Sequence, residues 1–522
     1  MPHLRTVRRA AFFIAMLQSW GASCQDPAVL HYWSGALDAT SIHVNALLSA
    51  PCDNVRLVVD DDQAFNSPSF SIPMSADSAH GLMARLRRGG LLPSTSYGYR
   101  FEVAGTIDTS SAHTGHFRTP GLGASSFSFI AGSCNSNSDH PVWQSMAWFQ
   151  PLLFIATGDL HYGDPTGIDV QTHRDAYIQG IYQHPGIMDL LHQVPIAYVW
   201  DDHDFCGDGS NGNAPGKTAA AQAYREHVPH YYLPHDTSVY QSFTIGRVHF
   251  ILSDLRSSKT AARMMDDPQR AWLREQLLFA RDSGLVACWV SPMTWNAQAY
   301  PENWGCQPQE RAALGDWLLE NHIEDLFILS GDAHMLAIDD GVNADFSTGH
   351  QSPYRYPIFQ AAAINRNGSY KGGTFNQGGY FPNPGTWVGQ FGQVLVEDDG
   401  EEMCITFNGW RTDSMSAAIS LLNTYTFCRQ PQPYHAVDEP PRPDGLRLWY
   451  DGWQELVLDG LDPAEPLDLR VIDVAGRVLI QRGYTPGIHQ DHVLLGQLSS
   501  GSYLAVARNG DNEVSTRFFV HQ

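Results

Sequence analysis

The chain has 522 residues, of which 43% are hydrophobic and 11% aromatic, so it is globular and too long for one ordinary core. Its 32 lysines and arginines face 55 aspartates and glutamates, which gives a net charge of −23. Such an acidic chain is a poor partner for nucleic acid or an anionic membrane, although a bound metal can reverse the charge locally and admit a phosphate-bearing substrate. We therefore expect two to four domains and no nucleic-acid-binding surface.

Residues 1–24 have the pattern of a signal peptide. Three arginines precede an apolar run at residues 10–17, and small residues follow it. The run is too short to span a bilayer, so we expect export without a transmembrane segment. Cys24 offers the alternative of a lipoprotein anchor, but Gly21 stands where lipoprotein signals carry a larger aliphatic residue. Simple cleavage is favoured, giving a secreted, periplasmic or cell-surface protein.

The chain has eight cysteines, and export would place them in an oxidising compartment. We predict a disulfide between Cys404 and Cys428, because they lie close together in a strand-rich region. Cys206 is either a disulfide partner or a second thiol beside the site described below. The pairing of the remaining cysteines stays open.

Residues 26–120 read as short alternating strands separated by turns. The clearest strands are 41–47, 54–59 and 97–103. Strands at this spacing, without helical periodicity, predict an antiparallel β-sandwich. The segments 92–100 and 117–120 resemble the closing strands of a fibronectin-type module in the immunoglobulin-like class. No catalytic grouping occurs here, so we expect a packing or positioning domain.

The pattern changes near residue 126. Apolar runs now alternate with helical stretches, which predicts an α/β sheet covered on both faces. The runs are 127–131, 152–156, 196–200, 248–252, 285–290 and 326–329. A helix is expected over 267–277, with Asp267 as its cap and Pro268 in its first turn. The segment 368–392 is rich in Gly, Asn, Pro and Tyr, which predicts a long loop.

Residues 431–444 are proline-rich and predict a linker. Residues 445–522 again alternate like short strands and predict a small C-terminal β-sandwich. Motifs at 474–478, 498–504 and 517–520 resemble the C-terminal sorting domain of the type IX secretion system. The resemblance implies that this machinery carries the protein across the outer membrane and that the domain is then removed. A generic β-sandwich binding module is the alternative.

Polar residues follow four strands of the 126–430 region. The segments are Ala131-Gly-Ser-Cys134, Gly158-Asp-Leu-His-Tyr162, Trp200-Asp-Asp-His-Asp204 and Ser330-Gly-Asp-Ala-His334. Because the carboxyl ends of neighbouring parallel strands meet at one edge, these side chains should converge. One such residue alone usually caps a turn, but four segments in succession indicate a site. Asp201 and Asp202 repel each other unless a cation holds them. Carboxylate, imidazole, phenol and thiol groups together suit two or more metals rather than a single zinc.

Together with Ser253-Asp-Leu-Arg256 and the helix at 269–273, these motifs resemble the alkaline phosphatase D (PhoD-like) family of calcineurin-like metallophosphoesterases. The resemblance covers about residues 30–428. It implies an α/β metallophosphoesterase core (126–430), in which helices sandwich mixed sheets. It also implies an alkaline phosphatase or phosphodiesterase that hydrolyses phosphate mono- or diesters.

The resemblance also implies the metals and their ligands. The family's usual Asp-X-His motif is replaced by Cys134, and its Gly-Asp-X-X-Asp by a segment that ends at Tyr162. Ferric iron is implied at a first position, because thiolate and phenolate stabilise Fe³⁺; its ligands are Cys134, Asp159, Tyr162 and His334. Ca²⁺, which prefers oxygen ligands, is implied at a second position. The ligands there are Asp159 as the bridge, Asp202, Asp332 and, as a further ligand, Asp201.

The implied mechanism is in-line attack on phosphorus by a metal-activated hydroxide, with no covalent serine. His203 would protonate the leaving oxygen or stabilise the transition state. Arg256 either contacts the substrate or pairs with Asp204, and a purely structural salt bridge is an equally good interpretation. Asp164 is expected to support these residues from a second layer.

Two departures from the family pattern stand beside this site. His161 replaces an uncharged residue, and Cys206-Gly-Asp-Gly replaces a segment that in relatives often runs Gly-Pro-Asn-Asn. A ligand after the Asp-Asp-His-Asp motif would therefore be Asp208 or Asn211. One alternative function is a catalytically silent exported surface or adhesion protein. Another keeps the metals but takes a phospholipid headgroup, a nucleotide or a teichoic-type polymer, selected by the loops at 207–215, 295–305 and 368–392.

Overall fold

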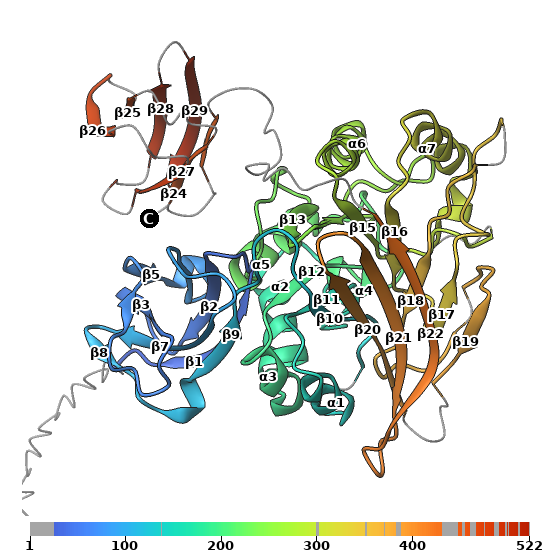
Figure 1. Ribbon diagram of the computed structural model, residues 1–522. Helices are drawn as coiled ribbons and strands as arrows, with labels where there is room; N and C mark the ends of the chain where they lie inside the picture. The colour runs from blue at the N-terminus through green and yellow to red at the C-terminus, as the bar shows by residue number, and fades with distance from the viewer. Residues whose placement is uncertain are drawn as a thin grey trace, which may run out of the picture.

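The computed structural model describes residues 26–136, 138–298, 302–349, 352–369, 371–382 and 388–430, together with parts of 447–520 (Figure 1). The predicted signal peptide with Cys24, and the predicted linker at 431–444, lie outside the described residues. Up to residue 430, the described chain is built on two large mixed sheets that pack face to face. Phe129 stacks edge-on against Phe250 at 5.3 Å and Phe359 lies 4.6 Å from Phe407, each pair joining one sheet to the other.

The first sheet contains nine of the described strands. Their order is β22 (Ile419–Arg429), β21 (Met403–Thr412), β20 (Gly389–Asp398), β10 (Phe127–Gly132), β11 (Leu153–Thr157), β12 (Ile196–Val199), β1 (Val29–Gly35), β2 (Ile42–Leu48) and β6 (Met83–Arg88). The three central strands β10, β11 and β12 run parallel. Their carboxyl ends therefore open on one edge, as the sequence pattern predicts.

The second sheet contains seven of the described strands. Their order is β13 (Gln241–Ile245), β14 (Val248–Leu252), β15 (Val286–Ser291), β16 (Leu326–Ser330), β18 (Ile358–Ala361), β17 (Leu336–Asp339) and β19 (Gln377–Tyr380). The run from β14 to β18 through β15 and β16 is parallel. All six apolar runs predicted as strands between 126 and 330 are therefore strands, and that prediction is confirmed.

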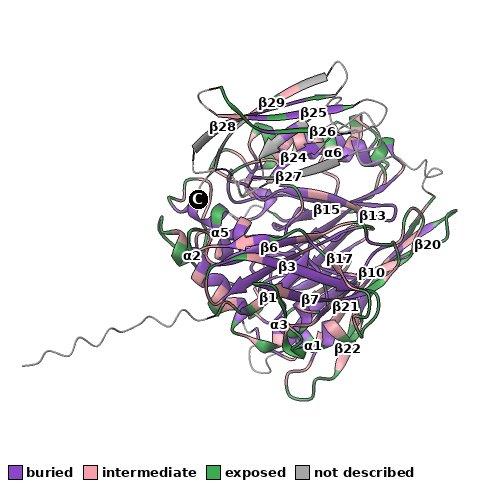
Figure 2. Ribbon diagram, turned by 90° about the vertical axis from the view of Figure 1, so that its left-hand side faces the viewer, coloured by how far each residue is buried: buried purple, intermediate pink, exposed green. Residues whose placement is uncertain are grey.

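Helices cover the outer faces of the two sheets (Figure 1). The helices beside the first sheet are α1 (Val142–Trp148), α2 (Val170–Tyr177), α3 (Pro185–Leu191) and α5 (Lys217–His227), and those beside the second are α6 (Asp267–Asp282) and α7 (Pro308–Glu320). The short helix α4 (Asp202–Phe205) lies at the edge of the first sheet. Each sheet thus has helices on one face and the other sheet on its second face, so both faces are covered and the mixed sheets lie between helices, as expected. The strands are buried over most of their length (Figure 2).

Two local expectations need correction. The cap of α6 is Asp266, whose carboxylate accepts a hydrogen bond from the backbone N–H of Gln269 at 3.1 Å, and Asp267 is the first helical residue. The segment 368–392 is not loop throughout, since it contains β19 and the start of β20. Short turns complete the described elements, at Ser78–His80, Ser111–His113, Ile178–Tyr182 and Trp304–Cys306.

The N-terminal strands pair antiparallel, as predicted, and they are divided between two sheets. The strands β3 (Cys52–Asp60), β4 (Ser69–Phe70), β5 (Met74–Ala76), β7 (Ser96–Val103), β8 (Thr106–Ile107) and β9 (Gly115–Arg118) make a six-stranded sheet. In contrast, β1, β2 and β6 extend the first large sheet, because Gly35 pairs with Ile196 on β12. A Cβ atom at Gly35 would lie 2.5 Å from the carbonyl oxygens of Ile196 and Pro229, so only glycine fits.

The C-terminal strands form two small antiparallel sheets with their own apolar core. One contains β23 (Arg447–Tyr450), β24 (Glu455–Asp459) and β27 (Gln490–Leu494); the other contains β25 (Leu467–Asp473), β26 (Val478–Tyr484), β28 (Gly501–Asn509) and β29 (Asn512–Val520). The predicted strand content of 445–522 is thereby confirmed. Its likeness to a sorting domain stays a prediction.

The disulfide between Cys404 and Cys428 is present, with an S–S distance of 2.00 Å, and it joins directly opposed residues of β21 and β22. Replacing both cysteines with serine should lower the free energy of unfolding by about 3 kcal/mol, because the crosslink closes a loop of 24 residues in the unfolded chain. Denaturant unfolding of the variant beside the wild type, each with and without reductant, measures the change. An unchanged midpoint would mean that the strand ladder alone fixes this hairpin.

Candidate metal centre

The polar strand ends converge where the carboxyl edges of the two sheets meet. Cys134 follows β10, Asp159 follows β11, Asp202 follows β12, and Asp332 and His334 follow β16. Donor atoms of Cys134, Asp159 and His334 lie within 4.8 Å of one another. A second group with the same spacing contains Asp159, Asp201, Asp202 and Asp332. Asp159 belongs to both groups, which is the position predicted for a bridging ligand.

The backbone turns sharply at these positions. Cys134, Asp159, Tyr162 and Asp332 have φ angles of 60°, 54°, 51° and 60°, in the left-handed region that residues other than glycine rarely adopt. Gly158, directly before Asp159, has φ 101°, and a Cβ there would lie 2.6 Å from the Cβ of Asp201. Strained backbone of this kind is retained where the surrounding structure holds side chains for a function.

Asp204 fixes the loop that carries Asp159 and Tyr162. Its carboxylate accepts hydrogen bonds from the backbone N–H groups of Leu160, His161 and Tyr162 at 2.9, 3.0 and 3.2 Å. These contacts use Asp204 as an anchor, so it is not the partner of Arg256.

Replacing Asp204 with asparagine should destabilise the fold by about 3 kcal/mol. The amide is uncharged, and its NH2 group would face backbone N–H groups that need an acceptor. The loop should then hold its ligands poorly, so bound metal and any phosphatase activity should fall together. Thermal unfolding and metal content of the purified variant measure both effects. Asp62→Asn, at an exposed turn, is the matched control. Wild-type stability and metal content in Asp204→Asn would contradict the anchoring role.

The first group combines a thiol, a phenol and an imidazole. His334 Nδ1 donates to the carbonyl oxygen of Asn367 at 2.7 Å, which leaves the buried Nε2 with a free lone pair. Burial and the charges of Asp159 and Asp332 raise the pKa of the Cys134 thiol well above its usual value. Burial, followed by Asp159 and Cys134, likewise raises the pKa of Tyr162, whose ring packs against Cys134. Both groups are protonated without a metal, and a highly charged cation would reverse this.

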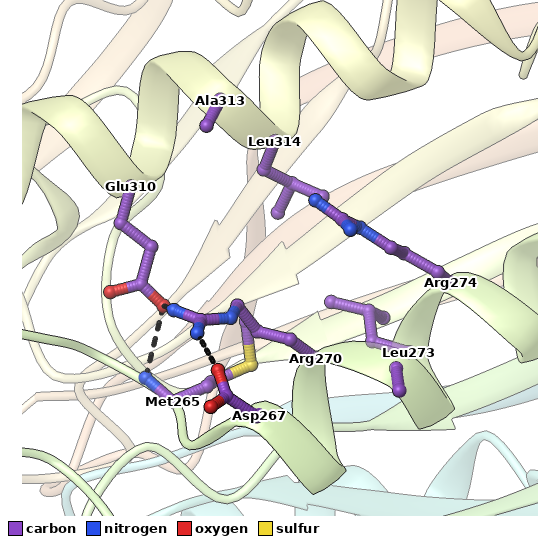
Figure 3. Close-up of a pocket in the computed structure, with 9 residues that line it drawn as sticks. Met265, Asp267, Arg270, Leu273, Arg274, Glu310, Ala313 and Leu314 are labelled. Atoms are coloured by element: carbon purple, nitrogen blue, oxygen red, sulfur yellow. Dashed lines mark hydrogen bonds and ion pairs between the residues drawn. The ribbon is translucent and has the colours of Figure 1, made fainter.

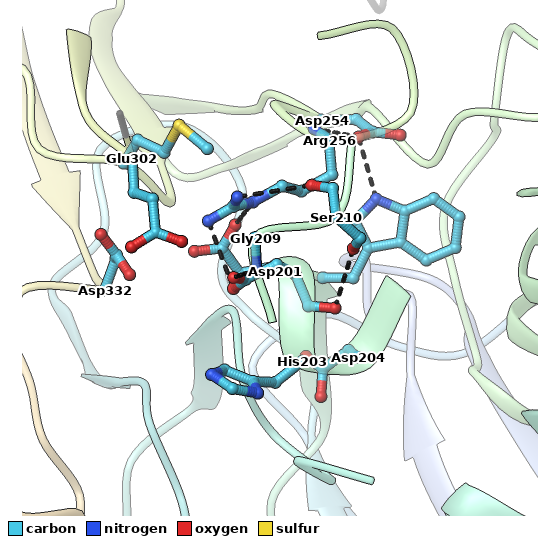
Figure 4. Close-up of polar contacts among 12 residues, drawn as sticks. Asp201, His203, Asp204, Gly209, Ser210, Asp254, Arg256, Glu302 and Asp332 are labelled. Carbon is cyan, nitrogen blue, oxygen red and sulfur yellow. Dashed lines mark hydrogen bonds and ion pairs between the residues drawn. The ribbon is translucent and has the colours of Figure 1, made fainter. Parts of the chain in front are cut away.

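The second group holds carboxylates whose oxygen atoms are only partly satisfied. Arg256 is fully buried; its Nε donates to Asp201, and its Nη2 lies 3.2 Å from Asp202 (Figure 4). In the described chain, both oxygens of Asp159 and the Oδ2 atoms of Asp201 and Asp332 have no hydrogen-bond partner, although all are buried. Buried carboxylate oxygens normally have partners. A cation is the partner that would satisfy the whole set.

The pKa values of these carboxyls reflect the same crowding. Burial and then the charges of Asp202 and Asp201 raise the pKa of Asp159 well above its ordinary value. Burial raises the pKa of Asp332 to about 7. Although burial also acts on Asp202, the charges of Arg256 and His203 outweigh it and lower the pKa of Asp202 to about 2. Ionisation of Asp159 is therefore the least compensated in this group, whereas Lys371 pairs with Asp332.

His203 lies at the outer side of this centre. Its Nδ1 donates to Asp164 at 2.6 Å, and its ring stacks on Tyr162 at a centroid distance of 3.7 Å. Its Nε2 faces the exposed carboxylate of Asp208, at 3.7 Å. The predicted supporting position of Asp164 is thus seen as an orienting contact to His203.

For four residues near the centre, the structure decides between or corrects the expectations drawn from the sequence. Arg256 pairs with Asp201 and Asp202 and not with Asp204, and its full burial favours a structural ion pair over substrate contact. Asn211 accepts a hydrogen bond from the N–H of Asn213, in a local turn. Cys206 is a free thiol, and burial raises its pKa to about 12. His161 is buried, and its Nδ1 accepts a hydrogen bond from the N–H of Gly163.

Three residues of the site were not anticipated. Lys371 Nζ lies 2.5 Å from Asp332 and 3.2 Å from Glu302. The Arg366 guanidinium lies 4.3 Å from the centroid of the Tyr162 ring. Figure 4 shows the carboxylates of Glu302 and Asp332 beside the Arg256–Asp201 pair. The only sequence signal was a charged residue at two of these positions, Glu302 and Lys371, in loops that were expected to shape substrate choice; Arg366 lies just before one of these loops.

A hollow of about 410 Å³ lies between α6 and α7, apart from this centre (Figure 3). It is lined by Met265, Asp267, Arg270, Ala271, Leu273, Arg274, Glu310, Ala313 and Leu314. Glu310 accepts hydrogen bonds from the N–H groups of Met264 and Met265 and pairs with Arg270. These polar contacts join the two helices, and none of the candidate ligands reaches the hollow.

Comparison with known proteins supports this picture. Residues 129–369 match the model of the family described as PhoD-like phosphatase. A search of curated proteins found no match. In the part of the chain that the structure describes, no helix is long and apolar enough to cross a membrane.

Two solved structures share the fold. The structure of PhoD superposes with a TM-score of 0.60 at 16% identity, over 77% of this chain and 91% of that one. Purple acid phosphatase PPD1 from yellow lupin (Lupinus luteus) seeds gives a TM-score of 0.53 at 10% identity, over 78% of this chain and 75% of that one. The predicted metallophosphoesterase-like core of mixed sheets is thus confirmed. The family match supports a phosphatase, and the two structures show the shared fold.

Proposed function

We propose that this protein is an exported, metal-dependent hydrolase of phosphate mono- or diesters. The observation that carries the proposal is the convergence of a thiol, a phenol, an imidazole and four carboxylates at one edge, with buried oxygen and nitrogen atoms that lack partners among the described residues. The match to the PhoD-like phosphatase model includes every one of these residues.

The residues fit two unlike metals. Thiolate and phenolate donors favour ferric iron at a first position, held by Cys134, Asp159, Tyr162 and His334. Oxygen-only ligation favours Ca²⁺ at a second position, held by Asp159, Asp202, Asp332 and the free oxygen of Asp201. When bound, these cations would neutralise the charge of a phosphate ester and activate water.

The chain's own residues supply orientation and a proton. Asp164 holds His203 through Nδ1, which leaves Nε2 to protonate the leaving oxygen of a substrate at the mouth of the centre. Arg256 keeps Asp201 and Asp202 fixed by buried contacts, so we assign it a positioning role. Arg366, stacked over Tyr162, adds positive charge beside the centre, which would favour binding of an anionic phosphate ester.

Metal analysis of the purified protein, together with turnover of nitrophenyl phosphate and bis-nitrophenyl phosphate, tests the proposal. We expect bound iron, activation by calcium and hydrolysis of at least one ester. Absence of hydrolysis under any metal addition would overturn it and would favour the alternative of a silent surface or adhesion protein. The ratio of the two rates decides between monoester and diester. Phospholipid headgroups, nucleotides and teichoic-type polymers complete the panel.

His203→Gln should lower kcat about 10²-fold for substrates with poor leaving groups, because the proton donor is lost. The loss should be smaller for nitrophenyl phosphate, whose leaving group needs little protonation. Steady-state rates on nitrophenyl and alkyl phosphates measure the contrast. His322→Gln, at a position outside the centre, serves as the control. Equal losses on both substrates would argue against proton donation.

We further propose export through residues 1–24 and delivery by the type IX secretion machinery through residues 445–522. The strand-rich C-terminal unit with a core of its own supports a separable module. Mass spectrometry of the protein recovered outside the cell tests both steps. Mature protein that begins near residue 25 and lacks the C-terminal unit is expected. Lipid attached at Cys24 would replace simple cleavage by anchoring.

A further inference from the structure

Lys371 is a cation inside the candidate metal centre. Its Nζ lies 2.5 Å from Oδ1 of Asp332 and 3.2 Å from Glu302. The Lys371 side chain is only 14% exposed, and that of Asp332 is fully buried. The backbone beside it is tied down, since Asn303 donates to the carbonyl oxygen of Lys371 at 2.7 Å. The contact therefore belongs to a held segment of the chain.

Two cationic side chains contact carboxylates of this centre, and they differ in how easily they can move away. Arg256 is fully buried and bonded to both Asp201 and Asp202, so it cannot leave without exposing them unpaired. Lys371 reaches Asp332 from the outer side on a flexible stem, with Glu302 as a second carboxylate. With a carboxylate on either side, the Lys371 ammonium is held as a cation. Of these two side chains, Lys371 is therefore the one that a metal ion could displace.

We propose that Lys371 competes with the second metal for Asp332, so that this chain holds its second metal weakly and its first tightly. The inference rests on the metal centre of the proposed function. The ammonium covers Oδ1 of Asp332, whereas Oδ2 has no partner among the described residues. A divalent cation at Asp332 must either push Lys371 towards Glu302 or lie beside a like charge. At a separation of a few ångströms, this repulsion lowers affinity by at least about tenfold.

The first position escapes this competition. Cys134 and His334 make no contact with an ammonium group among the hydrogen bonds and ion pairs of the described chain, and His334 Nε2 is free. Lys371 affects Cys134 only through a longer-range electrostatic interaction, without direct contact. A single lysine thereby separates the two positions into one that retains metal through purification and one that exchanges it.

Calcium titration of the full-length protein by calorimetry tests the proposal. Lys371→Met keeps most of the side chain and removes its charge, and it should bind Ca²⁺ at least about tenfold more tightly than the wild type. Lys371→Arg keeps the charge and should stay within about threefold of the wild type. Lys259→Met removes one positive charge outside the centre and is the matched control. Lys371→Gln is the second neutral variant if methionine impairs folding.

Equal or weaker calcium binding in both neutral variants would overturn the proposal, as would absence of binding in every protein. Detectable binding in the neutral variants alone would support it. The rise in thermal midpoint on adding Ca²⁺ gives a second readout, which should be larger in Lys371→Met. Phosphatase assays run separately. If calcium binding changes as expected while no ester is hydrolysed, the proposed function fails and the role of Lys371 stands.

Discussion

Asp159→Asn should abolish hydrolysis of phosphate esters, with kcat/KM falling at least about 10³-fold. Asp159 is the one carboxylate shared by both ligand groups, and neither of its oxygens has a hydrogen-bond partner in the described chain. An amide removes the negative charge from both positions at once. Metal content and kcat/KM, measured on the same preparation, show whether both losses occur. Retention of both metals and of the wild-type rate would refute the bridging role.

The same substitution should stabilise the metal-free protein. Burial raises the pKa of Asp159 above the value it has in the unfolded chain, so the carboxyl favours folding while protonated and opposes it as pH rises. An uncharged amide avoids this cost, so the variant should be more stable than the wild type at pH 8 and nearly equal to it near pH 4. Thermal unfolding in chelator at the two pH values measures this. A lower midpoint for Asp159→Asn at pH 8 would contradict the expected charge penalty.

Cys134→Ser should lose the metal of the first position, and activity should fall at least about 10²-fold. A serine hydroxyl is a poor substitute for a thiolate, although it fits the same buried space. Iron content and the visible absorption that thiolate and phenolate ligands give to ferric iron should fall together. Stability in chelator should change little, because the thiol is protonated there.

Cys206→Ser is the matched control, since that thiol is also free and lies just after the Asp-Asp-His-Asp motif. It should keep iron, colour and rate. If the two variants behave alike, the first metal does not depend on Cys134.

The strand ends were predictable because apolar runs and the residues that follow them lie next to each other in the sequence. Asp159 and Asp202 come together through that rule, whereas Asp332 follows β16 of the second sheet and joins them because the carboxyl edges of the two sheets meet. The left-handed backbone at Cys134 and Tyr162 was not predictable, since local preference opposes it there. Asp204 and Arg256 were misjudged because α4 turns adjacent aspartates to different sides, so Asp201 and Asp202 meet Arg256 while Asp204 faces the loop.

The other features that the sequence did not predict depend on contacts between distant parts of the chain. Lys371 and Glu302 belong to segments without periodicity, and only the folded chain brings them to Asp332. The extension of the first sheet by β1 depends on a single residue pair, Gly35 with Ile196. The sequence pattern of neither strand predicts this pair. The disulfide was simpler, because Cys404 and Cys428 lie on strands joined by one hairpin.

That pairing of β1 with β12 determines where the chain can be cut. A fragment that starts at residue 126 would remove the strand that pairs with β12 at Ile196, and an open strand edge invites pairing with other molecules. It would also remove Trp33, which donates to the carbonyl oxygen of His227 at 2.6 Å. The N-terminal strands thus protect the edge of the first large sheet. An expressed fragment should therefore begin before Val29.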